Sequence, residues 1–79
     1  MRRKTPKVVA TFACTSDAMA VEAAAREHGL PGRMIPVPAE ISSGCGLAWC
    51  APLEERGELE RALAAGGLAF EALHQVDLY

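Results

Sequence analysis

The sequence predicts an α+β protein with a ferredoxin-like fold, in which a four-stranded antiparallel sheet carries two helices on one face. Stretches rich in β-branched and aromatic residues alternate with alanine- and leucine-rich stretches of helical periodicity, in the order βαββαβ. The chain of 79 residues allows only one small domain, 1–79, so all of these elements must share a core. We expect residues 1–6 to be frayed, because they are polar and end in a Thr-Pro pair.

The first strand and the first helix are predicted from consecutive residues. Residues 7–14 are apolar on both faces and contain no strand breaker, as expected of a central strand. Thr15 and Ser16 are both favourable N-cap residues, and Asp17 places a negative charge at the positive end of the helix dipole. Gly29 then ends the helix in the C′ position.

The remaining elements are shorter. A second strand is predicted over residues 33–37 at a sheet edge, because Pro36 and Pro38 cannot donate to a neighbouring strand. A third strand is predicted over 47–51 and a second helix over 53–65, and an apolar stretch from Leu68 leads into a fourth strand that reaches about residue 76. In this topology the third strand lies between the first and the second and runs antiparallel to both.

Composition narrows the classes of function. A net charge of -2 and a pI near 5.6 leave no basic face that neutralises nucleic-acid phosphates. No apolar run is long enough to span a membrane, and the run after the basic N-terminus is a poor secretory signal. We therefore expect a cytoplasmic protein with three free cysteines and no cofactor. Because aromatic residues are few, the core is thin, and we expect a homodimer or a partner over one sheet face.

Cys45 stands at the centre of the loop between the second and third predicted strands. Gly44 and Gly46 flank it, and the hydroxyls of Ser42 and Ser43 precede it. Glycines permit positive φ and close backbone approach, so successive N–H groups can point at a thiolate, a persulfide or a bound anion. The alternative is that the glycines only turn the chain and that Cys45 is a small hydrophobe.

The predicted topology separates the three cysteines. Cys14 ends the first strand and Cys45 precedes the third, so both are expected at one edge of the sheet, beside the N-terminus of the first helix. That position favours the thiolate form. Cys50 is expected at the opposite edge. We therefore assign Cys45 as the reactive thiol; the residues expected to bind around it are Cys14, Thr15, Ser16, Ser42, Ser43, Gly44 and Gly46.

Neither a disulfide between Cys45 and Cys50 nor a metal site is expected. In one extended segment these two side chains point to opposite faces. Their spacing also lacks the second pair of ligands that zinc or an iron–sulfur cluster needs. His28 is a favourable charge at the end of a helix, and His74 has no second ligand at a suitable spacing.

The chain resembles a known family over nearly its whole length. The residues that carry the resemblance are 11–12, 15–18, 22, 29–31 and, above all, 35–48, which includes the prolines, the two serines and Cys45. They are similar to the small bacterial domain family DUF3343, whose members are described as selenium/sulfur carrier-like proteins. The resemblance implies a cysteine that carries sulfur or selenium, and Cys45 is the cysteine that matches. Cys14 and Cys50 stand where the family pattern requires no cysteine.

Three functions are therefore considered. The first is a carrier, rather than an enzyme, in which Cys45 accepts sulfur or selenium from a cysteine-desulfurase-like donor as a persulfide or selenosulfide and passes it to an acceptor protein. The alternative is a non-catalytic binding or regulatory module that acts through its proline-containing edge strand and cysteine loop. The third is a thiol-redox protein that uses Cys14 with Cys45.

Overall fold

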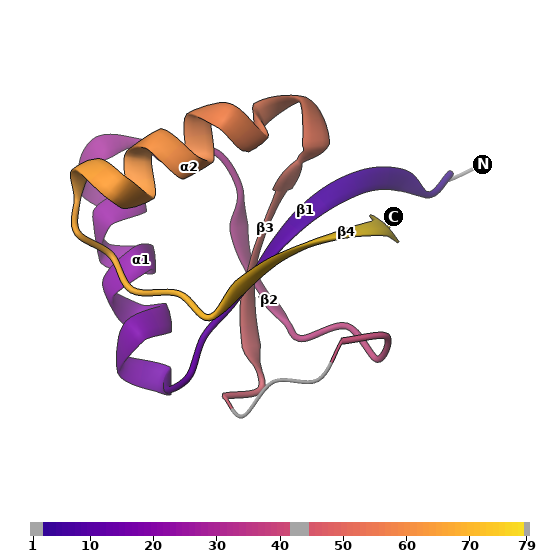
Figure 1. Cartoon of the computed structure of the whole chain (residues 1–79), viewed down its shortest axis with the longest axis horizontal. Helices are drawn as coiled ribbons and strands as arrows, with labels where there is room; N and C mark the ends of the chain where they lie inside the picture. The colour runs from indigo at the N-terminus through magenta and orange to yellow at the C-terminus, as the bar shows by residue number, and fades with distance from the viewer. Residues whose placement is uncertain (1–2, 42–44, 79) are drawn as a thin grey trace.

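The computed structural model describes residues 3–41 and 45–78. The elements follow one another as β1 (Thr5–Thr11), α1 (Thr15–His28), β2 (Arg33–Pro36), β3 (Leu47–Pro52), the 3-10 turn η1 (Leu53–Glu55), α2 (Arg56–Ala65) and β4 (Ala72–Leu78). The four strands form one sheet in the order β2-β3-β1-β4, and every neighbouring pair is antiparallel. Both helices lie on the same side of this sheet (Figure 1). The ferredoxin-like fold predicted from the sequence is therefore confirmed.

The first strand begins earlier than the sequence predicted and ends earlier as well. Thr5 and Pro6, which were expected to fray, belong to β1, where they pair with Leu78 and Asp77 of β4. Pro6 is tolerated because the pairing of β1 with β3 starts only at Lys7, so the missing N–H interrupts no bond to β3.

Helix α1 begins differently from the prediction. Its N-cap residue is Cys14, in extended conformation, and no side chain caps the helix, so Thr15 and Ser16 are not the caps. The hydroxyls of these two residues contact sulfur atoms instead. The C-terminal end is as predicted: Gly29 has a φ of 74°, and its N–H donates to the carbonyl of Ala25 at 2.8 Å.

The second predicted helix is divided in the structure. Its first three residues form the 3-10 turn η1, and the α-helical part starts at Arg56. A 3-10 turn is a frequent way to open an α-helix. Strand β2 is an edge strand, as the prolines indicated, and the third strand lies between the first and second.

The core has two parts because side chains of a strand alternate between the faces of the sheet. On the helix side the buried side chains are Val8, Ala10, Phe12, Ala18, Val21, Trp49, Ala51, Leu59 and Leu63. On the other face, called here the helix-free face, the buried cluster is Val9, Ile41, Ala48 and Cys50. Ile41 belongs to no strand but to the connection between β2 and β3, so this loop supplies part of the cover for the helix-free face.

Candidate functional site

Cys45 lies immediately before β3 and next to the first residue of α1. Its Sγ donates a long hydrogen bond to Oγ1 of Thr15, at 3.8 Å. The side chain is half-buried and packs against the helix-side core cluster. Thirty positions separate the two residues in the chain, so the antiparallel passage of β3 beside β1 is what brings them together.

Cys14 occupies the same end of α1. It is exposed, and its Sγ lies 3.2 Å from Oγ of Ser16. Its carbonyl oxygen accepts the N–H of Ala18 at 3.4 Å, the first bond of the helix. Two thiols thus contact the hydroxyls of two consecutive residues in the first turn of α1, so the structure brings Cys14, Thr15, Ser16 and Cys45 together at one edge of the sheet.

The loop that carries Cys45 is closed by a backbone hydrogen bond. The N–H of Val37 donates to the carbonyl of Gly46 at 3.0 Å. Gly46 has a φ of 81°, which a residue with a side chain rarely adopts. The turn into β3 therefore depends on the backbone freedom of glycine at this position. The predicted binding residues Ser42, Ser43 and Gly44 lie outside the described residues, so their expected contacts remain predictions.

Cys50 is separated from the other two thiols. It lies in β3 on the helix-free face, opposite Val9 and Arg33, and only 7% of its surface is exposed. Cys45 packs on the helix side, so the two side chains point to opposite faces, as expected. Burial raises the pKa of the Cys50 thiol, and the positive charges of Lys7 and Arg33 oppose this change in part.

The N-terminal end of α1 is a favourable place for a negatively charged sulfur. Free backbone N–H groups and the helix dipole place partial positive charge at a helix N-terminus. The Thr15 hydroxyl adds a group that can donate to an anion, because a hydroxyl can rotate its proton toward an acceptor. Cys45 therefore has a partly accessible sulfur in contact with a hydroxyl in the first turn of α1.

Metal binding and membrane insertion find no support in the part of the chain that the structure describes. Among residues 3–41 and 45–78, no three His, Cys, Asp or Glu side chains gather closely enough to hold an ion. None of the helices in these ranges has both the length and the hydropathy of a membrane-spanning segment.

Glu40 lies apart from Cys45. It is exposed and borders a hollow near His74 and Val76 of β4, whereas Cys45 packs on the helix side.

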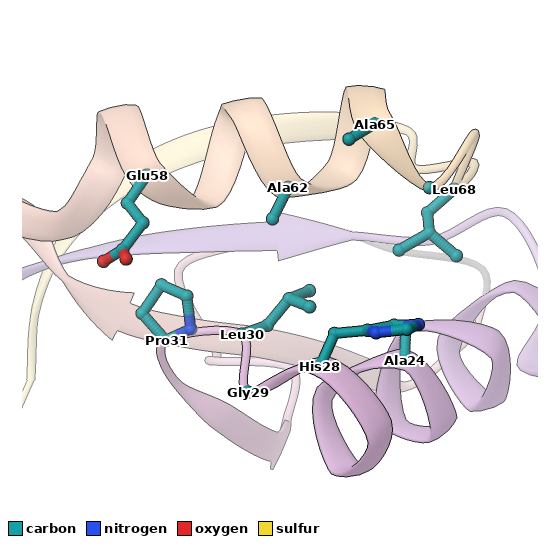
Figure 2. A pocket seen from close by; sticks show the side chains of 10 residues that line it. Ala24, His28, Gly29, Leu30, Pro31, Glu58, Ala62, Ala65 and Leu68 are labelled. Atoms are coloured by element: carbon teal, nitrogen blue, oxygen red, sulfur yellow. The ribbon is translucent and has the colours of Figure 1, made fainter.

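A second hollow of about 360 Å³ lies between the two helices. Figure 2 shows Ala62 and Leu68 on one side of it and Leu30 and His28 on the other. It lies at the C-terminal end of α1, far from Cys45, and no cysteine lines it. The hollow is therefore not part of the thiol site.

Sequence reasoning missed the surroundings of Cys50. Lys7 and Arg33 line a small hollow together with Cys50, although they are distant in the chain. The alternation within β1 and β3 could have placed Lys7 and Cys50 on one face, but only if the register of the two strands were known. The position of Arg33 depends likewise on the pairing of β2 with β3.

These features define a class: a small ferredoxin-like domain with a half-buried thiol at a helix N-terminus. The family model described as "Putative Se/S carrier protein-like" matches residues 7–75, which is most of the chain. The protein belongs to this family, and the resemblance drawn from the loop sequence is confirmed. Neither a curated protein nor a solved structure matches the chain.

Proposed function

We propose that this protein is a cytoplasmic carrier of sulfur or selenium and that Cys45 is the residue that carries the atom. The proposal is supported chiefly by the position of Cys45, whose half-buried sulfur contacts Thr15 at the N-terminus of α1. Family membership supports the general function of a carrier. A carrier meets a donor and an acceptor in turn, so the thiol must be reachable by two proteins.

The transfer of sulfur from a donor persulfide to Cys45 needs no external oxidant. The thiolate of Cys45 attacks the terminal sulfur of a persulfide on a donor such as a cysteine desulfurase. The new bond joins Cys45 Sγ to that sulfur, the S–S bond of the donor breaks, and the donor cysteine leaves as a thiolate. The same exchange with an acceptor thiolate then releases Cys45, and selenium can follow an equivalent path as a selenosulfide.

The first turn of α1 gives this chemistry a plain physical basis. A persulfide carries negative charge on its outer atom at neutral pH, and the helix N-terminus stabilises such charge. Thr15 is already within contact of Sγ, and Ser16 lies one position further along. Ser42, Ser43 and the backbone N–H of Gly44 are proposed as additional donors to the outer atom.

Intact-mass measurement tests the proposal. The reduced protein is incubated with a cysteine desulfurase and cysteine, and we expect a gain of one sulfur atom that dithiothreitol removes. Cys45→Ser abolishes the gain, whereas Cys50→Ser retains it and serves as the matched control. Sulfur that remains on the Cys45→Ser variant contradicts the assignment, and a wild-type protein that gains none leaves the binding-module alternative.

A thiol-redox function is a second candidate, because Cys14 and Cys45 contact neighbouring hydroxyls at the same helix end. Here both thiols lose a proton and an electron to an added mild oxidant, such as a small disulfide, and join as a disulfide. The protein mass then falls by two hydrogens, and Cys14→Ser abolishes this loss. A carrier that does not use Cys14 loads with sulfur equally well in the Cys14→Ser variant.

A further inference from the structure

A small hollow on the helix-free face joins three side chains that the carrier site does not use. It measures about 250 Å³ and is lined by Lys7, Arg33 and Cys50 together with Gly32, Ala51 and Pro52. The strand register explains why they meet: Cys50 pairs with Arg33 of β2 and with Val9 of β1, and Lys7 is the next residue of β1 on the same face. Three adjacent strands therefore contribute to one place.

The two cations in this hollow have no negative partner among the described residues. The ion pairs found among residues 3–41 and 45–78 join Arg26 to Glu22, His28 to Glu27 and Arg56 to Glu60. All of these residues belong to the helices. No carboxylate of the described chain lines the hollow either. Lys7 and Arg33 thus bring two positive charges to one concave surface without compensation.

The thiol of Cys50 is the third unusual group. It is more than nine-tenths buried, it borders the hollow, and no hydrogen bond is found for it within the described residues. Because burial raises its pKa, the thiol keeps its proton at neutral pH. A protonated thiol is a weak donor, so all three groups in the hollow present hydrogen atoms and none presents a negative charge.

We propose that the hollow formed by Lys7, Arg33 and Cys50 is a binding site for a small doubly charged oxyanion of the sulfate type. The charge of such an ion matches the two unpaired cations, and Arg33 can hold two of its oxygens at once. A hollow of about 250 Å³ is large enough for a tetrahedral ion. This site is separate from Cys45 and does not depend on the carrier proposal.

Gly32 fixes the position of Arg33 in this site. It has a φ of 109°, and a Cβ atom there would overlap the carbonyl oxygen of Cys50 and the indole nitrogen of Trp49. The close approach of this glycine to β3 is what brings the following residue beside Cys50.

Titration of the full-length reduced protein with sodium sulfate tests the proposal. Amide chemical shifts are followed by NMR at constant ionic strength, with chloride as the compensating ion. We expect saturable shifts at residues 7, 32–33 and 50–52, and weaker binding of nitrate, a planar oxyanion with a single charge. Arg33→Gln and Lys7→Gln should each weaken sulfate binding about tenfold, because each removes a charged hydrogen-bond donor.

Arg61→Gln is the matched control, since it removes one positive charge from an exposed position of α2, on the helix side of the sheet, and Arg61 does not line the hollow. Its sulfate affinity should equal that of the wild type. The proposal is overturned if sulfate causes no saturable shift, if nitrate binds as tightly as sulfate, or if the control loses as much affinity as Arg33→Gln. Unchanged sulfur loading on Cys45 in the Arg33→Gln variant keeps this result distinct from a failure of the carrier proposal.

Discussion

At the scale of single residues, the surroundings of a sulfur atom decide what each cysteine can do. Cys45 is half-buried and contacts a hydroxyl at a helix N-terminus. Cys50, five positions later, is enclosed between β1, β2 and the loop residue Ile41. The predicted topology already separated the two cysteines along the sheet, and the difference in their burial arises from the sheet face that each one occupies.

The raised pKa of Cys50 predicts a loss of stability at alkaline pH. The unfolded chain ionises this thiol at its ordinary pKa of 9.0, whereas burial keeps it protonated to higher pH in the folded state. The unfolded state therefore binds fewer protons above that pH, and the free energy of unfolding falls as pH rises. Urea denaturation from about pH 8 to about pH 10 should show a steeper decline for the wild type than for Cys50→Ala. Equal slopes would contradict the effect of burial.

Gly29 and Gly32 both have a positive φ, but they differ in the space available for a side chain. A Cβ at Gly32 meets the backbone of Cys50 and the side chain of Trp49, while a Cβ at Gly29 meets nothing within 4 Å. We expect Gly29→Ala to cost about 1 kcal/mol of unfolding free energy for backbone strain alone. Gly32→Ala should cost about 2 to 4 kcal/mol, because steric overlap adds to the strain. Equal losses in thermal or urea denaturation would show that crowding at Gly32 is not significant.

At the scale of elements, proline and glycine set the ends and the edge position of an element locally, whereas contacts between distant segments decide how α1 is capped. The edge position of β2 and the end of α1 at Gly29 were predicted because proline and glycine restrict the backbone wherever they occur. The start of α1 at Thr15 agrees with the prediction, but its capping residue was predicted wrongly, because Thr15 and Ser16 are good caps in isolation. In the folded protein their hydroxyls are engaged by Cys45 and Cys14, and those contacts depend on the position of β3 and on the rotamer of Cys14.

The turn between α1 and β2 is fastened to β3 by one side chain. The indole N–H of Trp49 donates to the carbonyl of Pro31 at 2.8 Å. Trp49→Phe keeps an aromatic ring in the core but leaves this carbonyl without its donor, so we expect a loss of about 1 to 2 kcal/mol in urea denaturation. Phe70→Leu, at an exposed position, should change stability by no more than about 0.5 kcal/mol. A neutral Trp49→Phe substitution would show that water replaces the indole.

At the scale of the whole molecule, the core is shared between both faces of a single sheet. The helices cover one face (Figure 1), and the connection between β2 and β3 places Ile41 over the other. A domain of this size buries a smaller share of its surface than a larger one. Each side chain that covers apolar area therefore accounts for a large part of the net stability.

Ile41 should accordingly behave as a core residue although it lies in a loop. It is 9% exposed and packs with Val9, Ala48 and Cys50. Ile41→Ala should lower the free energy of unfolding by about 2 to 4 kcal/mol, as in other core truncations. Met19→Ala, at a position that is 47% exposed, should have an effect below about 0.5 kcal/mol. A small effect of Ile41→Ala in urea denaturation would contradict this assignment to the core.

The amino-acid sequence was enough to predict the order of the elements, the edge position of β2, the end of α1 and the cysteine loop between β2 and β3. These features follow from local physics: side-chain periodicity, the restricted backbone of proline and the free backbone of glycine. The order of the helices and strands, together with the short length of the chain, predicted a ferredoxin-like arrangement around one core. That topology in turn predicted that Cys45 lies beside the start of α1.

Three features could be seen only in the folded protein: the contact of Cys45 with the Thr15 hydroxyl, the sheet face on which Cys50 is buried, and the meeting of Lys7 and Arg33 beside Cys50. Each of these depends on the pairing register of neighbouring strands. A shift of one residue in that register moves every side chain of a strand to the opposite face, and no pattern within a single strand specifies its partner. The chemistry of the thiols is therefore set by contacts between segments that lie far apart in the chain.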